Sequence, residues 1–155
     1  IDKPFLEMDL ATFDYTMRLN VYSYYFLTQR FARHWVENQV AGRVLLIGSI
    51  NGRLAEQVHS AYDTSKGAVE MMVKTLCGSL APHNIRVNGL APDFTLTDSL
   101  RKMAPAGVEN AKLMVPLGRA GHVDEMAGSA VFLAGEMSAY ITGQTINVDG
   151  GESMH

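Results

Sequence analysis

The sequence has little cysteine and no surplus of basic side chains, and each shortage excludes a class of protein. The one cysteine, Cys77, cannot support a disulfide framework or a cysteine-based zinc site, and the five histidines include no His-Glu-x-x-His pair. Thirteen Lys and Arg residues against sixteen Asp and Glu residues give a net charge of −3, so no basic surface is expected for nucleic acid. The longest aliphatic run, residues 44–47, is far shorter than the roughly 18 residues that span a bilayer. We therefore expect a cytoplasmic protein without metal, nucleic-acid or membrane partners.

The 155 residues, 47% of them hydrophobic and 19% charged, are typical of one globular domain. No repeat or linker divides the chain, so residues 1–155 are predicted to form a single domain. The sequence opens at Ile1 without an initiator methionine and without the pattern of a signal peptide. Two interpretations are open: a processed or tagged terminus, or a sequence that begins partway into a larger fold.

Hydrophobic periodicity alternates between helical and strand patterns along the chain. Helices are predicted at residues 10–38, 62–80 and 123–135 and within 94–116, and strands at residues 43–48, 85–90 and 144–148. This alternation predicts an α/β fold, a parallel sheet with helices on both faces. The strand at residues 44–47 is apolar enough to lie between two neighbours, yet no strand precedes the first helix. An exposed strand edge favours aggregation, so either another chain covers this edge or its natural neighbours are missing from the sequence.

Three polar side chains fall where an active site of such a fold is expected. Ser49 directly follows the first strand, and open α/β sheets bind ligands at the carboxyl ends of their strands. Tyr62 and Lys66 stand one helical turn apart on one face. An ammonium beside a phenol favours the phenolate and lowers the tyrosine pKa from about 10. The pair alone is weak evidence, because composition gives about 0.2 such matches by chance and, in isolation, an ordinary exposed helix face is the better explanation.

Further motifs surround this pair in a fixed order. Residues 62–66 read Tyr-Asp-Thr-Ser-Lys, with Ser49 thirteen residues upstream and Asn20 in the long first helix. Residues 85–92 read Ile-Arg-Val-Asn-Gly-Leu-Ala-Pro, residues 116–119 read Pro-Leu-Gly-Arg, and residues 141–151 contain Thr-Gly-Gln and Val-Asp-Gly-Gly. In this order the motifs resemble those of the short-chain dehydrogenases/reductases, over essentially the whole chain.

The resemblance implies roles for the four polar residues. Tyr62 would be the general acid/base that exchanges a proton with the substrate oxygen, and Ser49 would orient and polarise that oxygen. Lys66 would lower the pKa of Tyr62 and hydrogen-bond the nicotinamide ribose. Asn20 would hold a water molecule in the proton relay to Lys66.

The resemblance also implies a nicotinamide-binding loop after the second strand. The loop would begin at Pro92, Thr95 would contact the carboxamide through its backbone, and the Thr97 side chain would hold it. The family has glycine after this proline, whereas this chain has Asp93. Because glycine there lets the backbone pass close to the cofactor, Asp93 places the geometry of the loop in question. His59, three residues before Tyr62, either lines the substrate pocket or is a solvated loop side chain.

The glycine-rich dinucleotide fingerprint of the family does not occur in the sequence. The resemblance thus implies the C-terminal part of a doubly wound Rossmann-type sheet, N-terminally incomplete, with roughly 90 residues missing at about 30 per βαβ unit. The residue that selects NAD or NADP would lie in that missing part.

The predicted function is that of an NAD(P)-dependent oxidoreductase that interconverts an alcohol and a carbonyl. The nearest branches of the family are the oxoacyl reductases and the sugar or polyol dehydrogenases, and the partner is a small alcohol or ketone. The helices at residues 10–38 and 62–80 correspond to those that build dimers in the family, so a homodimer or homotetramer is expected. The alternative is a catalytically silent fragment or structural subunit that needs a missing N-terminal segment.

Overall fold

The computed structural model describes residues 3–103 and 105–154. The helices are α1 (Leu10–Met17), α2 (Ser23–Glu37), α3 (Ser60–Leu80), α4 (Asp98–Met103), α5 (Pro105–Met114) and α6 (Val123–Ala134). The strands are β1 (Gly42–Ile47), β2 (Ile85–Pro92), β3 (Thr95–Leu96), β4 (Gly121–His122) and β5 (Thr145–Val148). The three strands and the helices predicted at residues 10–38, 62–80 and 123–135 are confirmed, with ends that differ by one or two residues.

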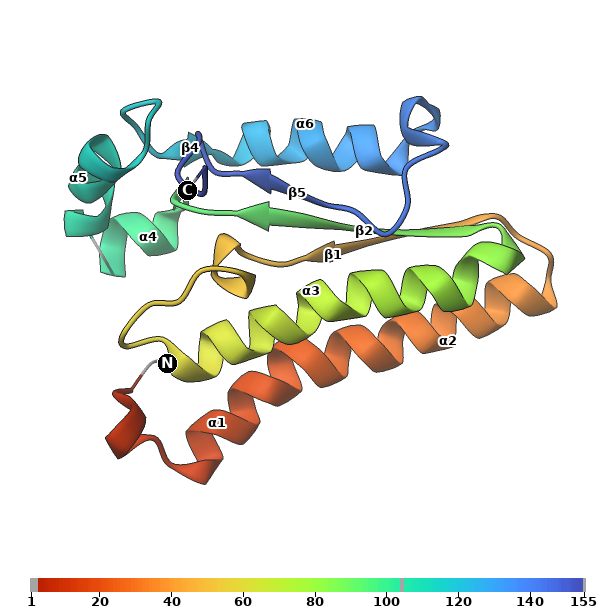
Figure 1. Ribbon diagram of the computed structural model, residues 1–155, viewed down its shortest axis with the longest axis horizontal. Helices are drawn as coiled ribbons and strands as arrows, with labels where there is room; N and C mark the ends of the chain where they lie inside the picture. Colours follow the sequence, from red (N-terminus) through yellow and green to blue (C-terminus); the bar gives the residue numbers. More distant parts are fainter. Residues whose placement is uncertain (1–2, 104, 155) are drawn as a thin grey trace.

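The main sheet has the order β1-β2-β5, and both pairs of strands are parallel. Helices α2 and α3 cover one face of this sheet and α6 covers the other (Figure 1). This arrangement confirms the predicted α/β fold with helices on both faces. In the register, Ile47 lies beside Leu90, and Pro92 beside Val148. The carboxyl ends of all three strands therefore meet at one edge of the sheet.

Helices α1 and α2 form one long rod that is interrupted by the π-helical segment Arg18–Tyr22. The rod begins where the Asp9 carboxylate accepts a hydrogen bond from the backbone N–H of Thr12 at 2.8 Å. The π-helical segment contains Asn20. Hydrophobic spacing predicts the rod but not this wider turn, because one extra residue in a turn barely changes the periodicity.

The main core lies between the sheet and α3. Leu46 of β1 packs with Val69 and Val73 of α3, and Tyr24 of α2 packs against this group from the side. The alternation of side chains along a strand and the 3.6-residue repeat of a helix place these aliphatic side chains on the facing surfaces of β1 and α3. The core thus fixes α3, which carries Tyr62 and Lys66, against the carboxyl half of β1.

Residues 94–116 contain two helices, α4 and α5, where the sequence predicts a helix in the middle of a mixed region. A proline at position 105 breaks the continuity of the helix. A short parallel pairing of β3 with β4 holds this region to the start of α6. A second apolar cluster of Ala111, Val115 and Ala120 packs α5 against Phe94 and Leu96 of the same region.

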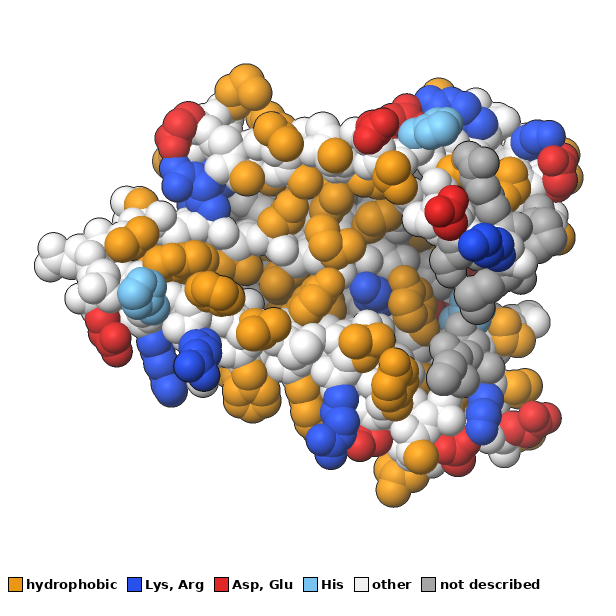
Figure 2. Space-filling model, turned by 180° about the vertical axis from the view of Figure 1, so that it is seen from behind, with side chains coloured by type: hydrophobic (Ala, Val, Ile, Leu, Met, Phe, Trp, Pro, Cys, Tyr) orange, Lys and Arg blue, Asp and Glu red, His pale blue; other side chains and the backbone are white. Residues whose placement is uncertain are grey.

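An apolar surface runs along β1 and α2. A groove of about 250 Å³ lies there, and Leu27 and Phe31 on α2, each 55% exposed, are among the side chains that line it. Hydrophobic side chains also gather in a band across the middle of the face shown in Figure 2. The outer edge of β1 pairs with no strand among residues 3–103 and 105–154. The predicted unpaired edge is therefore present.

Candidate active site

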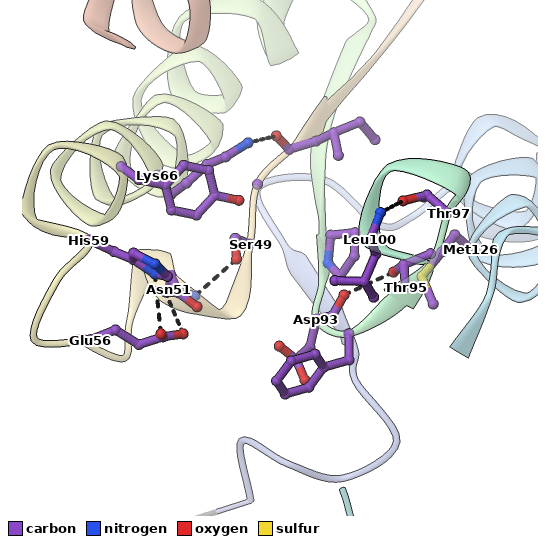
Figure 3. A pocket seen from close by; sticks show the side chains of 15 residues that line it. Ser49, Asn51, Glu56, His59, Lys66, Asp93, Thr95, Thr97, Leu100 and Met126 are labelled. Carbon is purple, nitrogen blue, oxygen red and sulfur yellow. Dashed lines mark hydrogen bonds and ion pairs between the residues drawn. The ribbon is translucent and has the colours of Figure 1, made fainter. Parts of the chain in front are cut away.

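A cavity of about 700 Å³ opens at the carboxyl ends of β1 and β2 (Figure 3). Six of the seven site residues predicted from the sequence line it: Ser49, Tyr62, Lys66, Pro92, Thr95 and Thr97. They come from the end of β1, from the first turns of α3, and from the end of β2 with the segment that follows it. The structure thus brings these residues together from three separate parts of the chain.

Ser49 is held at the end of β1 by the turn that follows it. Its hydroxyl oxygen accepts a hydrogen bond from the backbone N–H of Asn51 at 3.2 Å, which caps the short helical turn Ile50–Gly52. The Asn51 side chain in turn donates to Asp63 of α3 at 2.9 Å. Because the Ser49 oxygen is an acceptor here, its O–H proton is available to donate toward the cavity.

Lys66 is anchored beside Tyr62 on α3. Its Nζ donates to the backbone oxygen of Ile47 at 3.0 Å and lies 5.4 Å from the centroid of the Tyr62 ring. Lys66 is only 8% exposed, and this burial lowers the pKa of its ammonium group. One hydrogen bond to the strand leaves two N–H groups that can bind a hydroxyl in the cavity or stabilise a negative charge on the Tyr62 ring.

Asn20 is the predicted site residue that does not line the cavity. Its Nδ2 donates to Ser65 Oγ at 2.9 Å, and Ser65 Oγ donates to the backbone oxygen of Tyr62 at 2.6 Å. Ser65 is fully buried, so this link fastens the π-helical segment to the backbone of the residue that carries the phenol. The sequence analysis missed this contact. The signal that could have found it is a serine directly before Lys66 on the helix face that is turned inward.

The segment after β2 is ordered by its own threonines. Thr95 Oγ1 donates to the backbone oxygen of Asp93 at 2.9 Å. Thr97 Oγ1 accepts from the backbone N–H of Leu100 at 3.1 Å and so caps α4. Asp93 is not among the described non-glycine residues with positive φ, which are Gln39 and Asn84. An aspartate therefore fits at this position without backbone strain.

The cavity wall also contains side chains that the sequence analysis did not assign to it. These are Asn51, Glu56, Phe94, Leu100 and Met126, together with His59, for which the sequence left two interpretations open. His59 lines the cavity, and its Nδ1 lies 3.1 Å from the Glu56 carboxylate (Figure 3). Aside from the position of His59 near Tyr62, no spacing rule links these residues, because they come from different loops and helices.

Two other kinds of site are absent from the described ranges. No group of three or more His, Cys, Asp or Glu side chains there could hold a metal ion. Among the same residues, no helix combines the length and the apolarity that a membrane crossing requires.

Comparison with known families gives one match over nearly the whole chain. Residues 1–153 match a family profile described as enoyl-(acyl carrier protein) reductase. A 3-oxoacyl-[acyl-carrier-protein] reductase of Aquifex aeolicus is 34% identical over 150 residues, which cover 97% of this chain and 60% of that protein. A galactitol 2-dehydrogenase of Cereibacter sphaeroides is 37% identical over 94% of this chain and 59% of its own length.

Solved structures agree with these matches. A gluconate 5-dehydrogenase from Burkholderia cenocepacia, in complex with NADP and tartrate, superposes with a TM-score of 0.93 and 33% identity. The match covers 100% of this chain and 61% of the other. The chain therefore spans about 60% of the length of the relatives that it matches.

Proposed function

Because the chain belongs to the short-chain dehydrogenase/reductase family, we propose that it carries the catalytic pocket of an NAD(P)-dependent oxidoreductase that interconverts an alcohol and a carbonyl. The observation that carries the proposal is the common cavity of Ser49, Tyr62 and Lys66, with the lysine ammonium 5.4 Å from the tyrosine ring. A hydroxyl donor, a phenol and a cation around one space are what proton exchange with a carbonyl oxygen needs.

The cavity suits the nicotinamide end of such a cofactor. Lys66 offers N–H donors for ribose hydroxyls, and the segment from Pro92 through Thr95 to Thr97 offers backbone and hydroxyl groups for a carboxamide. The sequence contains no glycine-rich turn of the kind that cradles a pyrophosphate at a helix N-terminus. The residues present thus fit the nicotinamide nucleoside and not the phosphates. When bound, NAD or NADP supplies or accepts the hydride.

In the proposed reaction, the substrate oxygen lies between Ser49 and Tyr62. Ser49 donates a hydrogen bond to that oxygen and fixes its position. Tyr62 gives its proton to the oxygen during reduction and takes it back during oxidation. The Lys66 ammonium stabilises the phenolate that remains, which brings the Tyr62 pKa closer to neutrality. Asn20 acts through Ser65 to hold the backbone of Tyr62, and we propose that it also positions a water molecule for the relay.

We propose a substrate from the classes of the relatives, either a 3-oxoacyl compound or a sugar or polyol. We further propose a homodimer or homotetramer in the cytoplasm. What supports assembly is a groove of about 360 Å³ between α2 and α3, with Tyr25 in its wall and Phe26 60% exposed nearby on α2. Exposed aromatic side chains of this kind are typical of contacts between protein surfaces.

Replacement of Tyr62 by Phe tests the proposal, because it removes the proposed proton donor and changes little in volume. We expect kcat/KM for reduction or oxidation to fall about 10²–10⁴-fold, while the melting temperature stays within about 2 °C. The matched control is Tyr140→Phe, since Tyr140 is fully exposed. If Tyr62→Phe keeps more than about a tenth of the wild-type kcat/KM, Tyr62 is not the acid/base.

A second candidate is a catalytically silent fragment or structural subunit. It is favoured by the outer edge of β1, which pairs with no strand in the described part of the chain, and by a sequence without a glycine-rich turn. The intact mass of the protein isolated from its natural host discriminates the two. A mass well above that of this sequence, together with oxidoreductase activity, supports the enzyme, whereas a mass equal to it without activity supports the silent subunit.

A further inference from the structure

Two carboxylate oxygens are buried at the edge of the sheet beside the active site. Within the described residues, Asp93 Oδ2 and Glu152 Oε2 have no hydrogen-bond donor. A buried carboxylate oxygen without a donor is destabilising, so each one requires an explanation. The two side chains are neighbours, because Asp93 acts directly on the Glu152 carboxyl group and raises its pKa. Each orphaned oxygen thus belongs to one member of the same pair.

The register of the sheet brings these two residues together. Pro92 lies beside Val148, so Asp93 and Asp149 both follow the end of a paired strand at the same edge. After Asp149 the chain reverses through Gly150 and Gly151, whose φ angles are +65° and +94°. This reversal places Glu152 beside Asp93 again.

The Asp149 carboxylate fastens the reversed segment. Its two oxygens accept hydrogen bonds from the backbone N–H groups of Gly151 at 2.9 Å and Ser153 at 3.0 Å. Ser153 also accepts a hydrogen bond from the Asn147 side chain at 2.6 Å. The C-terminal turn, residues 149–153, is therefore held by these three hydrogen bonds, and its second acidic residue, Glu152, neighbours Asp93 of the loop after β2.

One proton between Asp93 and Glu152 would satisfy both orphaned oxygens, because a carboxylic acid can donate to a carboxylate. The charged groups that act on Glu152 from the surrounding loops are Asp93, Asp149 and Glu56, all acidic. Burial and these neighbours raise the pKa of Glu152 to about 8.

Among the described side chains, two cations near this turn, Arg53 and Arg119, are engaged elsewhere. Arg53 donates to Glu70 at 2.7 Å and to Asn147 at 3.3 Å. Arg119 makes two hydrogen bonds to Glu125, at 2.8 and 2.7 Å. With acidic neighbours around Glu152, a shared proton is the arrangement that relieves the repulsion.

We propose that Asp93 and Glu152 share one proton and act as a positioning pair that fastens the cavity segment, residues 93–97, to the C-terminal turn. Asp93 lines the cavity, and its backbone oxygen accepts a hydrogen bond from Thr95. Loss of the proton leaves two facing carboxylates that push this segment away from the turn. An effect of this movement on kcat/KM rests on the proposed function. The shared proton itself does not depend on that function.

The shared proton is tested by thermal unfolding of the protein as its gene encodes it, from pH 5 to pH 9. A carboxyl group whose pKa rises from 4.5 to about 8 on folding makes the folded state lose stability as the pH rises through that window. In Glu152→Gln the amide donates the same hydrogen bond and does not titrate. We expect the wild-type melting temperature to fall relative to this variant by about 2–4 °C between pH 5 and pH 9.

Glu109→Gln is the matched control, since Glu109 is exposed on α5 and paired with Lys112. Its difference from the wild type should stay constant over the same pH range. If Glu152→Gln gives parallel curves as well, the shared proton does not exist. Should that variant fail to fold, the ¹³C carboxyl resonance of Glu152 in the wild type decides, with a midpoint near 8 expected and one near 4.5 contradicting the proposal.

The positioning role needs a second readout, the pH profile of kcat/KM. We expect the ratio of wild-type to Glu152→Gln kcat/KM to fall roughly three- to tenfold between pH 7 and pH 9, because the segment is released only in the wild type. A constant ratio with a pH-dependent difference in melting temperature would reduce the pair to a structural role. Absence of any oxidoreductase activity would instead overturn the proposed function and leave the shared proton standing.

Discussion

The carboxyl edge of the sheet and the outer edge of β1 differ in how many of their groups have partners within the chain. At the carboxyl edge, Ser49, Lys66 and Thr97 each have a hydrogen-bond partner within the chain and together enclose a cavity. Along β1, Leu27 and Phe31 are more than half exposed beside a strand edge that has no partner among the described residues. The groups of the proposed site are therefore positioned within this chain, whereas the apolar surface along β1 is open.

The difference allows two questions to be tested separately: which residues carry out the proposed reaction, and what covers the apolar face along β1. The groups that we propose to move a proton are positioned by contacts inside the chain, so their roles are testable one residue at a time. Leu27 and Phe31 line one groove on this open face, and exposed apolar patches are typical of contacts between protein surfaces. Three matched pairs of residues, at positions 66 and 74, 46 and 27, and 150 and 78, compare a covered or constrained position with an open one.

The largest effect is expected at Lys66, compared with Lys74 two turns further along α3. Lys66→Ala removes the cation beside the Tyr62 ring and the donor for the ribose, so kcat/KM should fall about 10²–10⁴-fold and KM for the cofactor should rise. Lys74 is 56% exposed and pairs with Glu70. Lys74→Ala should keep nearly full activity in the same steady-state assay. Equal losses in both variants would show that the position of the charge does not matter.

The next comparison is between the stability effects of replacing a buried and an exposed leucine. Leu46 of β1 is 4% exposed in the main core, and Leu46→Ala should cost about 2–5 kcal/mol in the free energy of unfolding. Leu27 on α2 is 55% exposed, and Leu27→Ala should cost less than about 0.5 kcal/mol in this 155-residue chain. Chemical denaturation measures both. A cost above about 1 kcal/mol for Leu27→Ala would mean that the apolar face is already covered, for example by a second copy.

A smaller effect separates two glycines. Gly150 has a φ of +65°, and an added Cβ would lie 2.5 Å from Val115 Cγ1, so Gly150→Ala should cost about 1–3 kcal/mol. Gly78 on α3 has nothing within 4 Å of an added Cβ. Gly78→Ala should stabilise the protein by about 0.5–1 kcal/mol, since alanine is the better helix former. Melting temperatures of the two variants should therefore move in opposite directions, and a shift in the same direction would contradict the geometry of the C-terminal turn.

The smallest effect is expected at the start of α6. The Glu125 carboxylate accepts hydrogen bonds from Arg119 and from the backbone N–H of His122, which lower its pKa from 4.5 to about 2. A carboxyl group with a lowered pKa contributes stability above pH 4.5 that is lost as the pH falls through about 2. The melting temperature of Glu125→Gln should thus be slightly below that of the wild type at pH 7, and the difference should vanish by pH 2. A difference that is independent of pH would assign the effect to helix packing instead.

The sequence predicts the strands and the long helices well, and it singles out three residues that the structure places around one cavity. Buried strands and amphipathic helices have distinct periodicities, and Ser49, Tyr62 and Lys66 lie within or next to such elements. The π-helical segment at Asn20 and the bond from Asn20 to Ser65 leave no periodic signal. The pairing of Asp93 with Glu152 depends on the register of β2 with β5 and on a glycine turn, so it becomes visible only in three dimensions.

The central claim is that this chain's own residues carry out the proton transfer of a hydride-transfer reaction. The most direct measurement follows deuterium from the 4-position of a labelled reduced nicotinamide cofactor into the product alcohol, for the wild type and for Tyr62→Phe in parallel. The account predicts a single deuterium on the carbinol carbon with the wild type, and the same labelled product formed at least about 100-fold more slowly by Tyr62→Phe. Unlabelled alcohol, or equal rates of labelling by the two proteins, would contradict it.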